Sequence, residues 1–92
     1  MANYKLSPAA EDDLYQIWLY GLESWGENAA DQYIQSLLNR FQQIANYPSQ
    51  YPEVDHIRAG YRRSVYKNNS IFFCVNDNSV EIMAIVGKQN FP

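Results

Sequence analysis

Apolar side chains recur every three or four residues through the first half of the chain, which is the period of an amphipathic helix. The pattern predicts one helix over about residues 8–25 and a second from about Glu27 to just before Pro48, interrupted by Gly26. Ser7 is a suitable cap for the first helix, and Pro8 suits its first turn. So short a connection predicts an antiparallel helix pair. The periodic positions are Ala10, Leu14, Ile17, Trp18, Gly21, Leu22 and Trp25, then Ala30, Tyr33, Ile34, Leu37, Leu38, Phe41, Ile44 and Ala45.

The second half of the chain shows the shorter period of strands, after a proline-containing loop at residues 46–56. Residues 57–66 alternate, with odd positions more apolar than even ones, which predicts a strand whose Tyr61 and Val65 face the helices while Arg58 and Arg62 face outward. Residues 71–75 are apolar at every position, so we expect the most buried strand there. Residues 80–86 form the last predicted strand, and turns are expected at residues 67–69 and 77–78.

A further short alternating segment, residues 4–6, precedes the first helix and reads as an initial strand. The apolar faces of two helices need a common surface to cover, and a sheet provides one. We therefore predict a single α+β domain over residues 1–92. It consists of an N-terminal strand and an antiparallel two-helix hairpin packed on a three- to four-stranded, mainly antiparallel sheet.

Composition adds limits on the class of protein. With 47% apolar and 15% aromatic residues in 92 positions, the chain is globular with a modest core. It has neither an apolar run of membrane-spanning length nor a signal-like start, so we expect a soluble, unsecreted protein without a membrane partner. The single cysteine fits a reducing compartment.

Charge is distributed unevenly along the chain. Residues 1–55 hold eight acidic and two basic residues, whereas residues 56–92 hold two acidic and five basic ones. This division suggests two faces with different partners, or else a solvated helical pair beside an ordinary sheet surface. A pI near 4.9 argues against a dedicated nucleic-acid binder, and no direct sequence-specific nucleic-acid binding is expected.

Most residue types used in catalysis are missing or poorly placed. His56 is the only histidine, which excludes a histidine-based triad and a multi-histidine metal site. Cys74 lies in the most apolar strand and is interpreted as a core residue, and the acidic run at residues 11–13 as a complement to the helix dipole. There is no glycine-rich phosphate loop. We therefore expect no cofactor, no metal and no catalytic residue.

The basic cluster Arg58, Arg62, Arg63 and Lys67 is the strongest candidate for function. Guanidinium groups suit carboxylate and phosphate partners. Three roles are open: pairing with the acidic helices, recognition of an acidic protein segment, or phosphate contact in an RNA-cleaving site. Arg63 falls on the side that the alternation assigns to the core, so we expect an internal carboxylate to hold it.

The order strand, helix, helix, three strands, together with several motifs, resembles the RelE/ParE superfamily of toxins from type II toxin–antitoxin systems, and its ParE branch in particular. The motifs are L-S-P-A-A-E-D-D-L-x-x-I-W at residues 6–18, W-G-x-x-x-A at 25–30, I-R-A-G-Y-R-R-S-V-Y at 57–66, I-F-F at 71–73 and I-V-G-K-Q-N at 85–90. They cover nearly the whole chain, and G-Y-R-R is the most specific of them. Asn69 and Cys74 stand where many ParE-like sequences have His and Arg.

The resemblance implies a small cytoplasmic toxin that inhibits DNA gyrase by binding it, rather than an enzyme, and that is neutralised by a cognate ParD-like antitoxin. Two alternatives stay open: a RelE-type, ribosome-dependent mRNA endoribonuclease using Arg62, Arg63, Lys67 and Tyr61 or Tyr66, and a non-toxic antitoxin-binding relative. Phe91 stands near the C-terminus, where the ribonucleases tend to carry a tyrosine, which favours binding over cleavage. The predicted partner-binding residues are Arg58, Arg62, Arg63, Lys67, Lys88 and Gln89 toward the target, and Leu14 and Trp18 toward the antitoxin.

Overall fold

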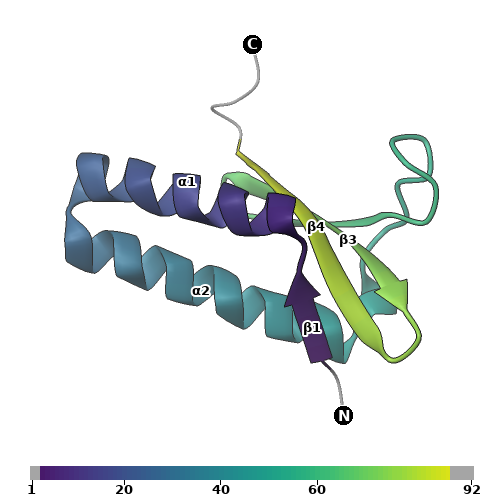
Figure 1. Cartoon of the computed structure of the whole chain (residues 1–92). Helices are drawn as coiled ribbons and strands as arrows, with labels where there is room; N and C mark the ends of the chain where they lie inside the picture. The colour runs from purple at the N-terminus through teal and green to yellow at the C-terminus, as the bar shows by residue number, and fades with distance from the viewer. Residues whose placement is uncertain (1–2, 88–92) are drawn as a thin grey trace.

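A computed structural model describes residues 3–87 and shows two helices packed against one face of a four-stranded sheet (Figure 1). The sheet order is β1-β4-β3-β2, with β1 parallel to β4 and the other neighbours antiparallel. The elements are β1 (Asn3–Leu6), α1 (Pro8–Trp25), α2 (Glu27–Asn46), a short 3-10 helix η1 (Pro48–Gln50), β2 (Arg62–Tyr66), β3 (Asn69–Asn76) and β4 (Ser79–Gly87). The predicted α+β architecture is confirmed.

The two helices begin and end where local signals in the sequence place them. Ser7 Oγ accepts a hydrogen bond from the Ala10 N–H (3.0 Å), and Pro8 occupies the first turn of α1. Gly26 joins the helices alone, at φ 93° and ψ 170°. Since backbone of this conformation is open almost only to glycine, Gly26 makes the tight antiparallel hairpin possible. The hairpin extends beyond the sheet on the Gly26 side (Figure 1), where the side chain of Trp25 is 52% exposed.

The core lies between the helices and the inner face of the sheet. Ten buried residues form it: Ala10, Leu37, Phe41, Ile44, Ala45, Ile71, Phe73, Val80, Ile82 and Ile85. In α2 they recur at helical spacing, and in β3 and β4 at alternate positions, as the periodic patterns require. No helix within residues 3–87 is long and apolar enough to cross a membrane.

The junction of β1 and α1 completes the hydrogen bonding of β4. β1 pairs with β4 only as far as Leu6 and Ile82, and beyond that point the β4 backbone needs other partners. Ser7 supplies two bonds, from its N–H to the Ile82 carbonyl (2.9 Å) and from Oγ to the Met83 carbonyl (3.0 Å). Asp13 Oδ2 accepts the next one from the Ile85 N–H (2.9 Å). Asp13 thus holds α1 against the sheet, a role beyond the dipole complement expected of residues 11–13.

The predicted strand over residues 57–66 is wrong in its first half. β2 begins only at Arg62, and residues 55–60 form turns in which Gly60 has a φ of 83°. Asp55 Oδ1 accepts a hydrogen bond from the Gly60 N–H (3.0 Å), which closes the turn locally. The residue of this loop that reaches the interior is Val54, not Ile57, whose side chain is 51% exposed.

The predicted facing of this strand is also reversed. Ser64 is buried on the helix side, whereas Val65 is 62% exposed on the other face. The prediction that residues 71–75 form the most buried strand is also wrong. β3 buries only Asn69, Ile71 and Phe73 and ends on exposed positions, whereas β4 buries Val80, Ile82, Ile85 and Gly87 and has no exposed residue. The outward positions of β3 include Cys74, which is partly exposed and therefore not a core residue. We call the side of the sheet away from the helices the open sheet face; its outward positions include Arg63, Val65, Ser70, Phe72, Cys74, Glu81, Ala84 and Val86.

Candidate partner-binding surfaces

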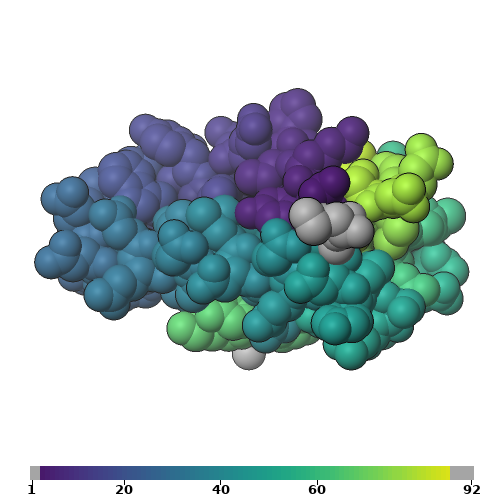
Figure 2. All heavy atoms as spheres, turned by 90° about the horizontal axis from the view of Figure 1, so that it is seen from below, coloured from purple at the N-terminus to yellow at the C-terminus, as the bar shows by residue number. Residues whose placement is uncertain are grey.

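The predicted antitoxin contacts Leu14 and Trp18 line an open apolar pocket beside the two helices. It has a volume of about 260 Å³, and Leu6, Glu11, Tyr15 and Ile34 complete its wall. Trp18 is fixed in the wall because its Nε1–H donates to Asp31 Oδ1 on α2 (2.9 Å) and its ring stacks on Tyr15 with centroids 6.2 Å apart. We call this pocket the helix groove. Figure 2 shows α1 and α2 side by side along one face of the molecule.

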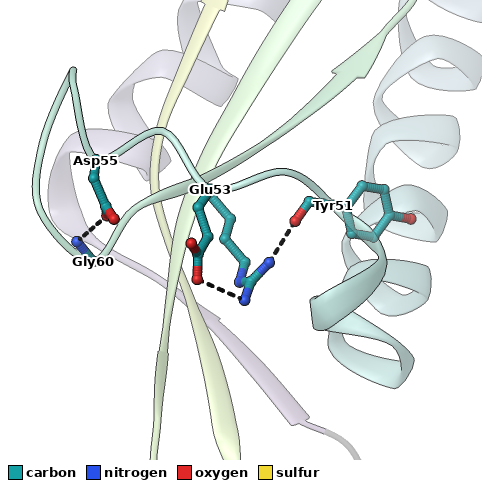
Figure 3. A network of polar contacts seen from close by, with 5 residues as sticks. Tyr51, Glu53, Asp55 and Gly60 are labelled. Atoms are coloured by element: carbon teal, nitrogen blue, oxygen red, sulfur yellow. Dashed lines mark hydrogen bonds and ion pairs between the residues drawn. The ribbon is translucent and has the colours of Figure 1, made fainter.

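Arg62, predicted to face a partner, is instead held within the molecule. Its Nη1 donates to the Tyr51 carbonyl (2.6 Å), and its Nη2 forms an ion pair with Glu53 Oε2 (3.2 Å) (Figure 3). The Arg62 side chain is 24% exposed, against 64% for Glu53. The exposed ion pair contributes little to stability, under about 1 kcal/mol. The guanidinium nevertheless ties the segment of Tyr51 and Glu53, which precedes the loop, to Arg62, which follows it as the first residue of β2.

Arg58 and Arg63 lie apart from Arg62. Arg58 is exposed in the turn at residues 55–60, so it does not share a strand face with Arg62. Its guanidinium carbon lies 5.7 Å from the centroid of the Tyr61 ring. Arg63 follows Arg62 in β2 and therefore lies on the opposite face of the sheet, opposite Phe72 in the register. Its Nε is buried and has no hydrogen-bond partner within residues 3–87. No internal carboxylate of the described residues holds it, contrary to the expectation.

Lys67 lies in the turn between β2 and β3, at φ 54°. Its Nζ is 5.4 Å from the ring centroids of both Tyr33 and Tyr66. The Tyr33 hydroxyl donates a hydrogen bond to Asn69 Oδ1, and burial, with a smaller effect of Tyr66, raises the pKa of Tyr33. The raised pKa moves this phenol further from ionisation at neutral pH. The predicted contacts Lys88 and Gln89 lie outside the described residues.

Two further residues belong to this region and were missed by the sequence reading: Arg40 on α2 and Ser64 on β2, joined by a hydrogen bond from Nη1 to Oγ (3.0 Å). Arg40 could have been singled out because it is one of only two basic residues in the acidic first half of the chain. No such signal marked Ser64, since the alternation placed it outward. Among residues 3–87 there is no group of three side chains suited to a metal ion.

Comparison with known proteins places this arrangement in a family. Residues 4–90 match the family described as the ParE toxin of the type II toxin–antitoxin system parDE. The chain belongs to the ParE toxin family. The resemblance found in the sequence motifs is confirmed, and the chain is a toxin component of a type II toxin–antitoxin system.

Individual ParE relatives agree with this assignment. Toxin ParE1 of Caulobacter vibrioides is 34% identical over 86 residues, covering 94% of this chain and 88% of the relative. Toxin ParE1 of Mycobacterium tuberculosis strain H37Rv is 29% identical over 86 residues, covering 92% and 88%.

Solved structures show the same fold at low sequence identity. A chain of the chromosomal ParDE toxin–antitoxin system from P. aeruginosa superposes with a TM-score of 0.82 at 19% identity, covering 95% of this chain and 96% of that one. A conserved hypothetical protein from Helicobacter pylori superposes with a TM-score of 0.58 at 14% identity, covering 97% of each. The ParE architecture therefore persists where most side chains differ.

Proposed function

We propose that this ParE-family chain acts by binding, that its target is DNA gyrase, and that a ParD-like antitoxin neutralises it. The observation that carries binding over RNA cleavage is that the basic residues diverge. Arg62 is engaged by Tyr51 and Glu53, and Arg63 lies on the other face of the sheet. A general acid and base need to converge on one phosphodiester. A binding surface has no such requirement.

The directions of the pKa shifts also favour binding over RNA cleavage. Within the part of the chain that the structure describes, two groups have a clearly shifted pKa, Tyr33 and Cys74, and both pKa values are raised chiefly by burial. A catalytic base or nucleophile working near neutral pH needs the opposite change, toward the ionised form. Neither residue is therefore suited to start a cleavage reaction.

For the target we favour the open sheet face. Arg63 has a buried Nε without a partner among residues 3–87, and the partly exposed Phe72 and then Ala84 follow it in register across β3 and β4. An arginine set among apolar groups is typical of energetically important positions in protein interfaces. Arg58, Lys67, Lys88 and Gln89 remain predicted contacts around it, and Arg62 is expected to act through the shape of its loop.

For the antitoxin we favour the helix groove. Its lining is almost wholly apolar, with Leu14 and Trp18 in the wall, which fits the apolar side of an amphipathic segment. Fluorescence tests this placement in a Trp25→Phe variant, where Trp18 is the single tryptophan. Adding the cognate antitoxin should change its emission, and the matched Trp18→Phe variant, which reports on Trp25, should respond less. Unchanged Trp18 emission at saturating antitoxin would place the antitoxin elsewhere.

The target is tested by adding the purified protein to a gyrase supercoiling assay and to a cell-free translation reaction with transcript mapping. Inhibited supercoiling with intact transcripts is the expected result. New transcript ends with normal supercoiling would instead identify a RelE-type ribonuclease. No effect in either assay would indicate a non-toxic member that retains only antitoxin binding.

A further inference from the structure

A second pocket lies away from both surfaces, where α2 meets β2. Its volume is about 250 Å³, and it is lined by Ser36, Asn39, Arg40, Gln43 and Tyr66. Unlike the helix groove, it has a mainly polar lining with one positive charge and no carboxylate. We call it the Arg40 pocket.

Arg40 is oriented by two contacts. Its guanidinium carbon lies 4.7 Å from the centroid of the Tyr66 ring, and its Nη1 donates to Ser64 Oγ (3.0 Å). Stacking on an aromatic ring and a single hydrogen bond fix the plane of the guanidinium. The side chain is thus held in place before any ligand arrives.

The rest of the guanidinium has no partner among the described residues. Within residues 3–87, Nε is buried without a hydrogen-bond partner, and the bond to Ser64 is the one hydrogen bond that the group makes. No carboxylate of the described residues lies within ion-pair distance of Arg40. Nε and Nη2 form one edge of the guanidinium and together suit a bidentate carboxylate. A buried Nε–H without a hydrogen-bond partner is costly to the isolated chain.

We propose that the Arg40 pocket receives the carboxylate of a glutamate or aspartate side chain from a protein partner. The volume is ample for one carboxylate side chain, and the amides of Asn39 and Gln43 supply further donors. Both residues are exposed positions of α2, so their side chains can adjust to an incoming carboxylate. An RNA backbone is the weaker alternative because the chain carries a net charge of −3, which repels a polyanion over a long range.

The Arg40 Nε–H signal in a nitrogen–proton NMR spectrum of the full chain gives a direct test. The probes are acetate, a capped Ala-Glu-Ala peptide and its Ala-Gln-Ala analogue, each measured against chloride at equal ionic strength. We expect a saturable shift with acetate and with the Glu peptide, and at least about tenfold weaker binding of the Gln analogue. The exposed Arg58 signal should change only slightly. Loss of the signal in Arg40→Lys assigns it.

A second variant leaves Arg40 in place, so its result does not depend on whether a substitution of Arg40 disturbs the fold. Gln43→Glu places a carboxylate on the pocket wall, so it should shift the Arg40 signal without added ligand and abolish the acetate response. Gln16→Glu, the same change at an exposed position of α1, should leave both unchanged. A shift of the Arg40 signal that rises linearly with acetate and equals the shift with chloride would overturn the proposal. Tighter binding of inorganic phosphate and oligouridylate than of acetate and the Glu peptide would also overturn it, because that result would identify a nucleic-acid site.

Discussion

Asp12 and Asp13 are neighbours on α1 with the same charge, but they have different roles. Asp13 is partly buried and accepts a hydrogen bond from the Ile85 N–H of β4, whereas Asp12 is exposed and has no such bond to the described residues. One residue along a helix changes direction by about 100°, so only one of the two can reach the sheet. Sequence alone did not distinguish them, because nothing in it shows which backbone N–H lacks a partner.

Replacing Asp13 with Ala should therefore lower the free energy of unfolding by about 1–3 kcal/mol, the cost of leaving a partly buried N–H without its charged acceptor. Asp12→Ala is the matched control and should change it by less than about 0.5 kcal/mol. Urea denaturation of both variants measures the difference. Equal effects would mean that the Asp13 hydrogen bond contributes nothing beyond the helix dipole.

Cys74 provides a pH-dependent prediction. Burial, and then the carboxylate of Glu81 opposite it on β4, raises the pKa of its thiol, outweighing the smaller lowering effects of Asn76 and Lys5. At any given pH the thiolate fraction is then smaller than in free cysteine. The rate of alkylation by iodoacetamide should rise with pH along a curve whose midpoint lies above that of free glutathione.

Glu81→Gln isolates the electrostatic part of this effect. Removing the neighbouring negative charge should move the alkylation midpoint to lower pH, although the thiol remains equally covered. Mass spectrometry follows a single site, because Cys74 is the only cysteine. A wild-type midpoint at or below that of glutathione would contradict the raised pKa.

At the scale of elements, the sequence was most informative where structure is decided locally. Both helices follow from periodic apolar positions, a cap at Ser7 and a stop at Gly26, all within a few residues of the element they define. The start of β2 and the direction of its side chains depend instead on contacts with residues about ten positions earlier in the chain. Arg62 turns inward because Tyr51 and Glu53 receive it, so the strand starts there and its even positions face the helices.

This reversal explains why the candidate site was only partly predictable. Side chains alternate along a strand, so assigning the wrong face at one position inverts the assignment of all the others. Arg63 was assigned inward and Arg62 outward, and the structure exchanges them. The residues on the helices needed no such choice of face, and Leu14 and Trp18 do lie together in one groove.

Gly26 should be difficult to replace because of its backbone conformation alone. Its φ of 93° and ψ of 170° are strained for any residue with a Cβ, so Gly26→Ala should cost about 1–3 kcal/mol, although nothing lies within 4 Å of the added carbon. Ser24→Ala, an exposed change in the last turn of α1, is the control. Chemical denaturation compares them, and a neutral Gly26→Ala would show that the hairpin can form with another linker geometry.

At the scale of the whole molecule, the two proposed surfaces are physically separate. The helix groove is formed by α1, α2 and the end of β1, and the open sheet face lies on the side of the sheet away from the helices. A substitution on one surface should therefore leave binding at the other unchanged, because additivity holds for distant sites without shared partners. Neutralisation by an antitoxin in the groove would then require a segment long enough to reach around the sheet, or a change in the sheet itself.

A substitution of Arg63 tests whether the two surfaces are separate. It also tests whether this arginine is kept for binding although it does not stabilise the fold. Its buried Nε is unpaired within the described residues, so Arg63→Met removes that unsatisfied donor while keeping an apolar stem opposite Phe72. The free energy of unfolding should stay within about 0.5 kcal/mol of wild type or rise, because no bond is lost. The concentration needed to inhibit gyrase supercoiling should nevertheless increase at least about tenfold, as expected for an interface arginine.

The control is Lys5→Met, which removes one positive charge from β1, at the opposite edge of the same sheet from β2. It should leave gyrase inhibition within about twofold of wild type, since a peripheral exposed charge contributes little to affinity. Both variants should bind the antitoxin as tightly as the wild type. If Arg63→Met were destabilised and fully inhibitory, Arg63 would be a structural residue of the sheet, and the target surface would have to be sought at Lys67 and the loop of residues 55–60.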